Sequence, residues 1–167
     1  CLRKLICLIP SLLITLITNP SRQKLKELFL THFFASMSIQ QLREAGKGFA
    51  ASARLARLVR PEALRRIAWH RTQGHRCVLV SASVDIYLAP WSSQTGFHEL
   101  ICSQLEITSE GVITGRLAGK NCWGAEKLMR LEALFGPQSG YTLYAYGDSR
   151  GDKELLAAAD YPFFRPF

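Results

Sequence analysis

Two apolar runs that each end abruptly in small polar residues constrain the fold of this chain most. Residues 77–80 are continuously apolar and stop at Ser81-Ala82-Ser83, while residues 142–146 stop at Gly147-Asp148-Ser149. A short unbroken apolar run is typical of a strand buried on both faces of a parallel sheet. In open sheets of this kind, ligands bind beyond the carboxyl ends of the strands. The sequence therefore predicts an α/β protein with a ligand site where these two runs end.

Helical and strand patterns alternate around the two runs. Residues 1–66 are mostly helical in pattern, and further helices are expected over residues 62–73, 84–95, 124–135 and 153–159. Strands are expected over residues 99–105 and 142–146, a hairpin over 106–117, and a last strand or packed tail over 161–167. This alternation favours an open, mostly parallel sheet with crossover helices. We expect a helical segment over residues 1–66 and an α/β core over residues 67–167.

The positive charge lies almost entirely in the first half of the chain. Residues 1–76 hold 14 Lys and Arg against 3 Glu, whereas residues 77–167 hold 7 Lys and Arg against 10 acidic residues. A basic half beside an acidic half suits an anionic small molecule or an anionic membrane surface near a metal-binding site. A solvated cationic helix surface is the alternative interpretation. No nucleic-acid reader motif accompanies the basic residues, so we expect no nucleic-acid partner.

The cysteines and the apolar N-terminal stretch indicate the cellular compartment in which the protein is expected. Five unclustered cysteines without a CxxC pair predict neither a zinc site nor a disulfide framework. Reduced thiols of a cytoplasmic protein fit best. The uncharged stretch over residues 5–18 has 14 residues, fewer than the roughly 20 that a membrane span needs. Residues 1–18 are therefore expected to form a buried or membrane-touching helix, and a weak membrane-surface contact stays open.

Two carboxylates follow the second apolar run. Asp148 and Asp152 are four residues apart, next to Gly147 and Gly151, and glycines let the backbone turn tightly beside a ligand. Carboxylate oxygens are hard ligands of the kind that Mg²⁺ takes, together with water and substrate phosphate. The pattern favours Asp148 and Asp152 as metal residues, with an Asx turn that caps the helix at Lys153 as the alternative.

Phosphate-binding groups are expected beside these carboxylates. The Ser81 hydroxyl and the Ala82 amide can donate to phosphate oxygens, although Ser81 or Ser83 could instead cap the next helix. Lys127 can neutralise charge on a transferring phosphoryl group, with Lys120 as a nearby competitor. These parts together predict a magnesium-dependent phosphoryl-transfer site.

The order of these motifs resembles motifs two, three and four of the haloacid dehalogenase superfamily. Further short segments of the sequence, within about residues 20–167, resemble its subfamily IB, the phosphoserine-phosphatase-like hydrolases. These segments are Trp69-His70-Arg71, Gly74-His75, Asn121-Cys122, Glu126-Lys127 and Tyr146-Gly147-Asp148-Ser149. The resemblance implies a Rossmann-like sheet with a helical cap and Mg²⁺-dependent hydrolysis of a phosphomonoester through an aspartyl-phosphate. The substrate would be a small phosphomonoester or a phospholipid headgroup phosphate.

The resemblance also assigns roles to the residues already singled out. Ser81 and Ala82 would bind the transferring phosphate, Lys127 would steady it, Asp148 would bind Mg²⁺, and Asp152 would support the metal from close by. Lys127 and Asp152 would thus serve catalysis. The sequence indicates no oligomeric state.

One family motif has no counterpart in this sequence. The family's nucleophile lies in an Asp-x-Asp motif after the first, central strand, and no aspartate occurs before Asp85. We expect that strand to be missing, the sheet to have a gap, and the chain to be an N-terminally truncated, inactive form. A degenerate, non-catalytic binding or scaffold protein is the alternative. A Rossmann-type nucleotide binder is disfavoured, because neither GxGxxG nor GxxxxGK[ST] is present.

Overall fold

The computed structural model describes residues 21–167, and the chain divides into two compact units. Unit 1 consists of Cys1–Ala45 and Gln104–Lys120, and unit 2 consists of Gly46–Ser103 and Asn121–Phe167. The expectations for residues 1–18 lie outside the described residues. The division into a helical segment over residues 1–66 and a core over residues 67–167 stays a prediction.

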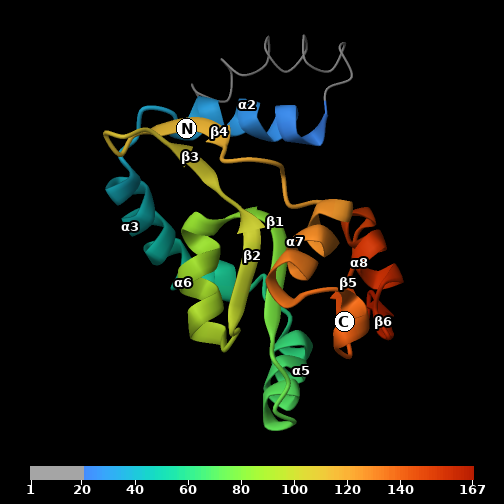
Figure 1. Ribbon diagram of the computed structural model, residues 1–167. Coiled ribbons are helices and arrows are strands. Elements are labelled where there is room, and N and C mark those ends of the chain that lie inside the picture. The colour runs from blue at the N-terminus through green and yellow to red at the C-terminus, as the bar shows by residue number, and fades with distance from the viewer. Residues whose placement is uncertain (1–20) are drawn as a thin grey trace. The chain divides into compact units, whose positions relative to one another are not determined.

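Unit 1 packs one helix on a β-hairpin (Figure 1). Helix α2 (Arg22–Phe34) begins at Ser21, whose hydroxyl accepts a hydrogen bond from the Lys24 amide. Strands β3 (Leu105–Ile107) and β4 (Ile113–Leu117) pair antiparallel. The Glu27 carboxylate of α2 accepts the Leu117 amide of β4 at 3.1 Å. The hairpin expected over residues 106–117 is therefore confirmed.

Unit 2 holds the two apolar runs, now as strands, and most of the helices. Its strands are β1 (Val78–Val84), β2 (Glu99–Ser103), β5 (Tyr144–Gly147) and β6 (Tyr161–Phe164). Helix α3 (Ile39–Ala50) leads into it, followed by α4 (Ala53–Ala56), α5 (Pro61–Thr72), α6 (Asp85–Thr95), α7 (Ala125–Phe135) and α8 (Lys153–Ala157). Two short 3₁₀ turns complete it, η1 (Gln138–Gly140) and η2 (Arg150–Asp152).

Local signals explain where several helices begin and end. Ser38 and Gln41 form a reciprocal capping box before α3, with the Gln41 amide bonded to the Ser38 hydroxyl at 3.2 Å. Pro61 occupies the first turn of α5, where its missing amide proton costs nothing. None of the helices described over residues 21–167 is long and apolar enough to cross a membrane.

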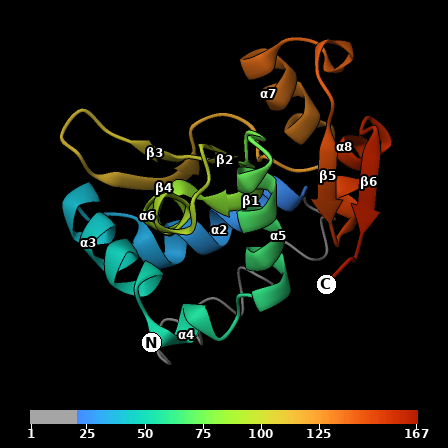
Figure 2. The ribbon, with the colours of Figure 1, turned by 90° about the horizontal axis from the view of Figure 1, so that it is seen from below.

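The strands of unit 2 form two separate parallel pairs (Figure 2). β1 pairs with β2 from Val78↔Glu99 onward, with an irregularity between Ser81 and Val84, and β5 pairs with β6 from Tyr144↔Tyr161 onward. Among residues 21–167, β1 pairs with no strand other than β2, and β5 with none other than β6. The expected α/β class is confirmed, and no strand of the described chain joins β1 to β5.

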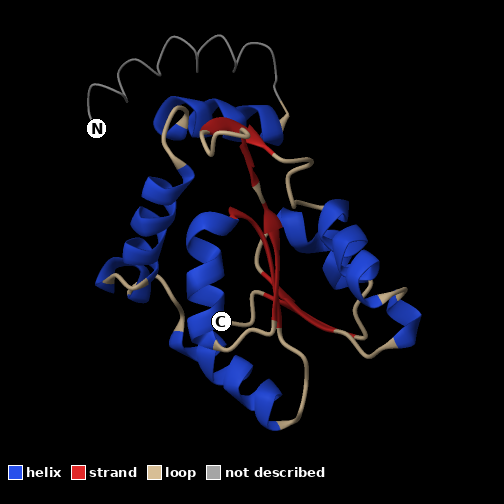
Figure 3. Ribbon diagram, turned by 60° about the vertical axis from the view of Figure 1, so that its left-hand side comes forward, coloured by secondary structure: helices blue, strands red, loops and turns tan. Residues whose placement is uncertain are grey.

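Helices lie on both sides of these strands (Figure 3). α7 and α8 share one apolar cluster with β1, β2 and β5, formed by Ile101, Cys122, Leu131, Ala145 and Leu155 with Val78 and Val80 packed against it. All seven residues of β1 are nevertheless only half-buried, whereas the sequence predicted a strand buried on both faces. Within residues 21–167, one edge of β1 has no neighbouring strand, and its aliphatic side chains are partly exposed.

Candidate active site

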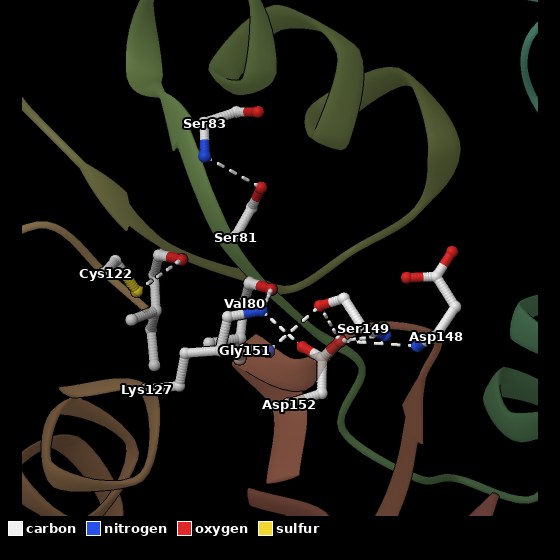
Figure 4. Close-up of polar contacts among 10 residues, drawn as sticks. Val80, Ser81, Ser83, Cys122, Lys127, Asp148, Ser149, Gly151 and Asp152 are labelled. Atoms are coloured by element: carbon white, nitrogen blue, oxygen red, sulfur yellow. Dashed lines mark hydrogen bonds and ion pairs between the residues drawn. The ribbon is translucent and has the colours of Figure 1, made fainter. Parts of the chain in front are cut away.

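A buried ion pair joins α7 to the turn after β5, beside Val80 of β1 (Figure 4). The Lys127 ammonium on α7 contacts Oδ1 of Asp152 at 2.5 Å and also donates to the Val80 carbonyl of β1 at 3.3 Å. Both residues are 7% exposed. Lys127 therefore links Val80, in the first half of β1, to the turn that follows β5.

The second carboxylate oxygen of Asp152 is held by the turn itself. Oδ2 accepts the Ser149 hydroxyl at 2.7 Å, the Ser149 amide at 3.0 Å and the Asp148 amide at 3.3 Å. Burial raises the pKa of Asp152, but the hydrogen bonds from Lys127 and Ser149 and the Lys127 charge outweigh it, so the pKa is lowered. Asp152 is thus kept ionised and fixed in one orientation.

Gly147, the last residue of β5, allows this close packing. A Cβ atom at position 147 would lie 2.5 Å from the Cβ of Asp152, closer than two carbon atoms can approach. The position of Asp152 therefore requires a residue without a Cβ atom at position 147.

Two backbone contacts dock the start of α7 on its neighbours. The Gly124 amide donates to the Gly151 carbonyl at 3.0 Å, which ties the helix to the turn after β5. The Ser103 hydroxyl at the end of β2 accepts the Cys122 amide at 3.0 Å and bonds Asn121 at 2.9 Å. These contacts fix the start of α7, and with it the backbone of Lys127, relative to β2 and the turn after β5.

The predicted phosphate-binding residues lie one and two positions beyond Val80. Ser81 Oγ accepts the Ser83 amide at 3.1 Å, and this turn falls within the irregular part of β1. The Ser81 hydroxyl retains its proton for donation to another acceptor. Figure 4 shows Ser81 directly following the carbonyl that Lys127 contacts.

Asp148 differs from Asp152 in its surroundings. Its carboxylate is turned away from the buried pair (Figure 4), its side chain is 64% exposed, and Arg60 approaches it at 4.0 Å. Asp148 thus offers a carboxylate that a metal ion could reach, whereas both oxygens of Asp152 already accept hydrogen bonds. Residues 21–167 contain no group of three His, Cys, Asp or Glu side chains placed to hold a metal. The predicted roles of Asp148 and Asp152 at a metal ion therefore stay predictions.

A histidine cluster under β5 was not anticipated from the sequence. His70 Nδ1 lies 2.8 Å from His75 Nδ1, and His70 Nε2 lies 2.8 Å from the Tyr146 hydroxyl. Burial, followed by the charges of His75 and Arg66, lowers the pKa of His70. The five-residue spacing across Gly74 indicates only two histidines at a helix end, and the contact with Tyr146 depends on packing that no local pattern reveals.

Comparison with known proteins identifies the family. A family model described as haloacid dehalogenase-like hydrolase matches residues 2–157. The chain belongs to this family. Protein CicA from Caulobacter vibrioides is 36% identical over 155 residues, which cover 93% of this chain and 69% of that protein.

Solved structures show the same fold at lower identity. A protein with unknown function from Bordetella pertussis Tohama I superposes with a TM-score of 0.74 at 23% identity, covering 92% of this chain and 70% of that one. A probable phosphoserine phosphatase from Vibrio cholerae gives a TM-score of 0.62 at 18% identity, over 90% of this chain and 45% of that one. The expected membership of the haloacid dehalogenase family and its fold is thereby confirmed.

Proposed function

We propose that this chain carries the phosphate-handling part of a magnesium-dependent phosphomonoester hydrolase of subfamily IB. The observation that carries the proposal is the buried Lys127–Asp152 pair, which joins Val80 of β1 to the turn after β5. A fixed ammonium in a low-dielectric site stabilises developing negative charge better than a solvated one does. The substrate is a small phosphomonoester or a phospholipid headgroup phosphate, and the site of action is the cytoplasm.

Each residue has a role that its surroundings support. Ser81 and the Ala82 amide donate to the phosphate oxygens, and Lys127 neutralises charge on the transferring group. Asp148, with its exposed carboxylate, is the metal ligand. Asp152 supports that position from the adjacent turn while it holds Lys127. A magnesium ion bound there would offset the negative charge of the phosphoryl oxygens.

The covalent step needs a carboxylate that the printed sequence does not hold before Asp85. In the family route, an aspartate attacks phosphorus, the bond to the leaving alcohol breaks, and water then releases inorganic phosphate. We therefore expect the 167-residue chain to show no turnover by itself.

The test compares two forms of the chain with an aryl phosphate and Mg²⁺. One is the 167-residue chain, and the other carries an apolar strand that ends in Asp-x-Asp joined ahead of Cys1. Turnover in the extended form alone is expected, and Asp148→Asn should abolish it. Glu110→Gln, which removes an exposed carboxylate in unit 1, is the matched control. Turnover by the 167-residue chain, or none by the extended form, would contradict the proposal.

A non-catalytic role is the second candidate, because the exposed Asp148 carboxylate can bind a metal ion without any nucleophile. In that role the site binds inorganic phosphate or Mg²⁺ without hydrolysis. Titration calorimetry distinguishes it from the first candidate. Phosphate binding that depends on Lys127, with no turnover in the extended chain, is the expected result for a binding protein.

A further inference from the structure

A continuous row of aromatic rings runs from α5 across β5 to β6. The centroid of the Trp69 ring lies 6.0 Å from that of His75, and His75 stacks on Tyr144 at 5.4 Å. Tyr144 in turn stacks on Tyr161 at 4.4 Å. Trp69 and Tyr161, at the two ends of the row, are 42% and 49% exposed. All four residues belong to unit 2, so the row is one surface of a single unit.

A second stack lies next to this row. The Tyr146 ring stacks on Phe163 at 4.7 Å. The register pairs Tyr144↔Tyr161 and Tyr146↔Phe163 are two residues apart, which places both stacks on the same face of the β5–β6 pair. Exposed apolar surface rimmed by polar residues is typical of interaction sites. We call this surface the aromatic face, and it consists of Trp69, His75, Tyr144, Tyr146, Tyr161 and Phe163.

Exposed arginines border the aromatic face. The Cζ atom of Arg66 lies 5.3 Å from the centre of the Trp69 ring. Arg60 approaches the Asp148 carboxylate at 4.0 Å, and Nε of Arg165 donates to the Asp148 carbonyl at 3.2 Å. The arginine rim, formed by Arg60, Arg66 and Arg165, therefore extends from the aromatic face to the candidate metal residue.

The charge around the face is mainly positive. Residues 54–76, which include α5, hold seven Arg against one Glu, a net charge of +6. That glutamate, Glu62, is bonded to Arg65 at 2.9 Å. On the β6 side, Asp160 accepts the Leu143 amide at 2.8 Å. Rings with a cationic border are complementary to a surface that is apolar inside and anionic outside.

We propose that the aromatic face and its arginine rim dock on the surface of an anionic lipid bilayer. Trp and Tyr are enriched where a bilayer meets water, because each combines an apolar ring with a polar group. Basic side chains add attraction to anionic headgroups. Since Arg60 and Arg165 also flank Asp148, docking turns the Asp148 edge of unit 2 toward the headgroups. The inference goes beyond the proposed function, because docking needs neither hydrolysis nor a metal ion.

The stacking favours a bilayer over a single-stranded nucleic acid. A nucleobase binds an aromatic side chain through a ring face that is free to stack. Tyr144 already stacks on two neighbouring rings, and so does Tyr146. Arg66 covers the Trp69 ring. The face therefore offers ring edges and polar groups, which suit the headgroup region of a bilayer.

Vesicle sedimentation with the whole 167-residue chain tests the docking. The chain should bind vesicles that contain phosphatidylcholine and phosphatidylglycerol in equal parts, and bind phosphatidylcholine vesicles more weakly. Arg66→Gln should weaken binding to the anionic vesicles about fivefold, and adding Arg60→Gln should weaken it about 25-fold in total. Arg116→Gln, which removes an exposed charge in unit 1, is the matched control. No binding to the anionic vesicles, or equal losses for Arg66→Gln and Arg116→Gln, would overturn the proposal.

Quenching of tryptophan fluorescence by brominated lipids locates the contact. Emission of the wild-type chain should fall on anionic vesicles whose acyl chains carry bromine. Trp69→Phe keeps an aromatic ring at position 69 and should lose most of this quenching. Quenching that is the same in Trp69→Phe and in wild type would place the contact elsewhere and overturn the proposal.

Two further results would assign the aromatic face to another partner and overturn the proposal. One is tighter binding of a single-stranded oligonucleotide than of anionic vesicles. The other is a dimer in light scattering that Tyr161→Arg dissociates. Vesicle binding is measured without Mg²⁺ or a phosphomonoester, so its outcome is independent of the test of hydrolysis.

Discussion

Removing the ammonium of Lys127 should destabilise unit 2 by about 3 kcal/mol. In Lys127→Met, Oδ1 of Asp152 loses the donor that contacts it at 2.5 Å, in a site where the residue is only 7% exposed. Breaking a buried pair from one side costs about 3–5 kcal/mol. We expect the lower end of that range, because Oδ2 keeps its bonds to Ser149 and the Asp148 amide.

Urea unfolding followed by tryptophan fluorescence measures this loss. With a slope of about 2 kcal/mol per molar urea, the midpoint should fall by about 1.5 M. The double variant with Asp152→Asn should lose less than the two single variants added together, by about 1–2 kcal/mol. Lys153→Met removes an exposed lysine nearby and should change stability by less than about 0.5 kcal/mol. A midpoint shift below about 0.5 M, or simple additivity, would refute the reasoning.

The pH dependence of the same loss follows from the lowered pKa of Asp152. Its stabilising contribution is complete above the ordinary carboxyl value of 3.8 and fades as the pH falls through the lower folded-state pKa. The difference between wild type and Lys127→Met should therefore shrink below about pH 4. A difference that stays constant in acid would contradict the ion-pair explanation.

Three further substitutions test the surroundings of the site. The lowered pKa of His70 makes protonation favour the unfolded chain, so the protein should lose stability as the pH falls below the ordinary imidazole pKa of 6.5. His70→Gln should reduce this loss of stability. Thermal unfolding at pH 8 and pH 5 measures the effect, and an unchanged pH dependence would contradict the prediction. Gly147→Ala should cost about 2 kcal/mol by pushing on Asp152, which urea unfolding detects, and an unchanged midpoint would count against the steric argument. Ser103→Ala should cost about 2 kcal/mol by removing the buried hydroxyl that accepts the Cys122 amide. Exposed Ser93→Ala is the control in the same melts, and equal stability of the two variants would contradict the prediction.

Local patterns predicted the elements well because each carried its own signal. The apolar run before Ser81 became β1, and the helices expected over residues 62–73, 84–95 and 124–135 became α5, α6 and α7. The turn after β5 was likewise predicted from alternating glycine and acid. These features depend on neighbours within a few residues, which a single sequence displays.

Contacts between distant segments could not be predicted in this way. The sequence presents Asp148 and Asp152 as equivalent carboxylates, yet one is largely exposed and the other is buried against Lys127. The difference arises from the docking of α7 on the turn after β5, through Gly124 and Gly151. The roles of Ser81, Ala82, Lys127, Asp148 and Asp152 as functional residues stay predictions.

The partial exposure of β1 depends on neighbours that the strand's own sequence does not display. Val78, Leu79 and Val80 form an apolar run suited to a strand with neighbours on both edges, but the described chain supplies a neighbour on one edge only. Burying such side chains contributes about 25 cal/mol per Å² of apolar surface. An apolar run therefore predicts that a strand will form, whereas the extent of its burial depends on which segments pack against it.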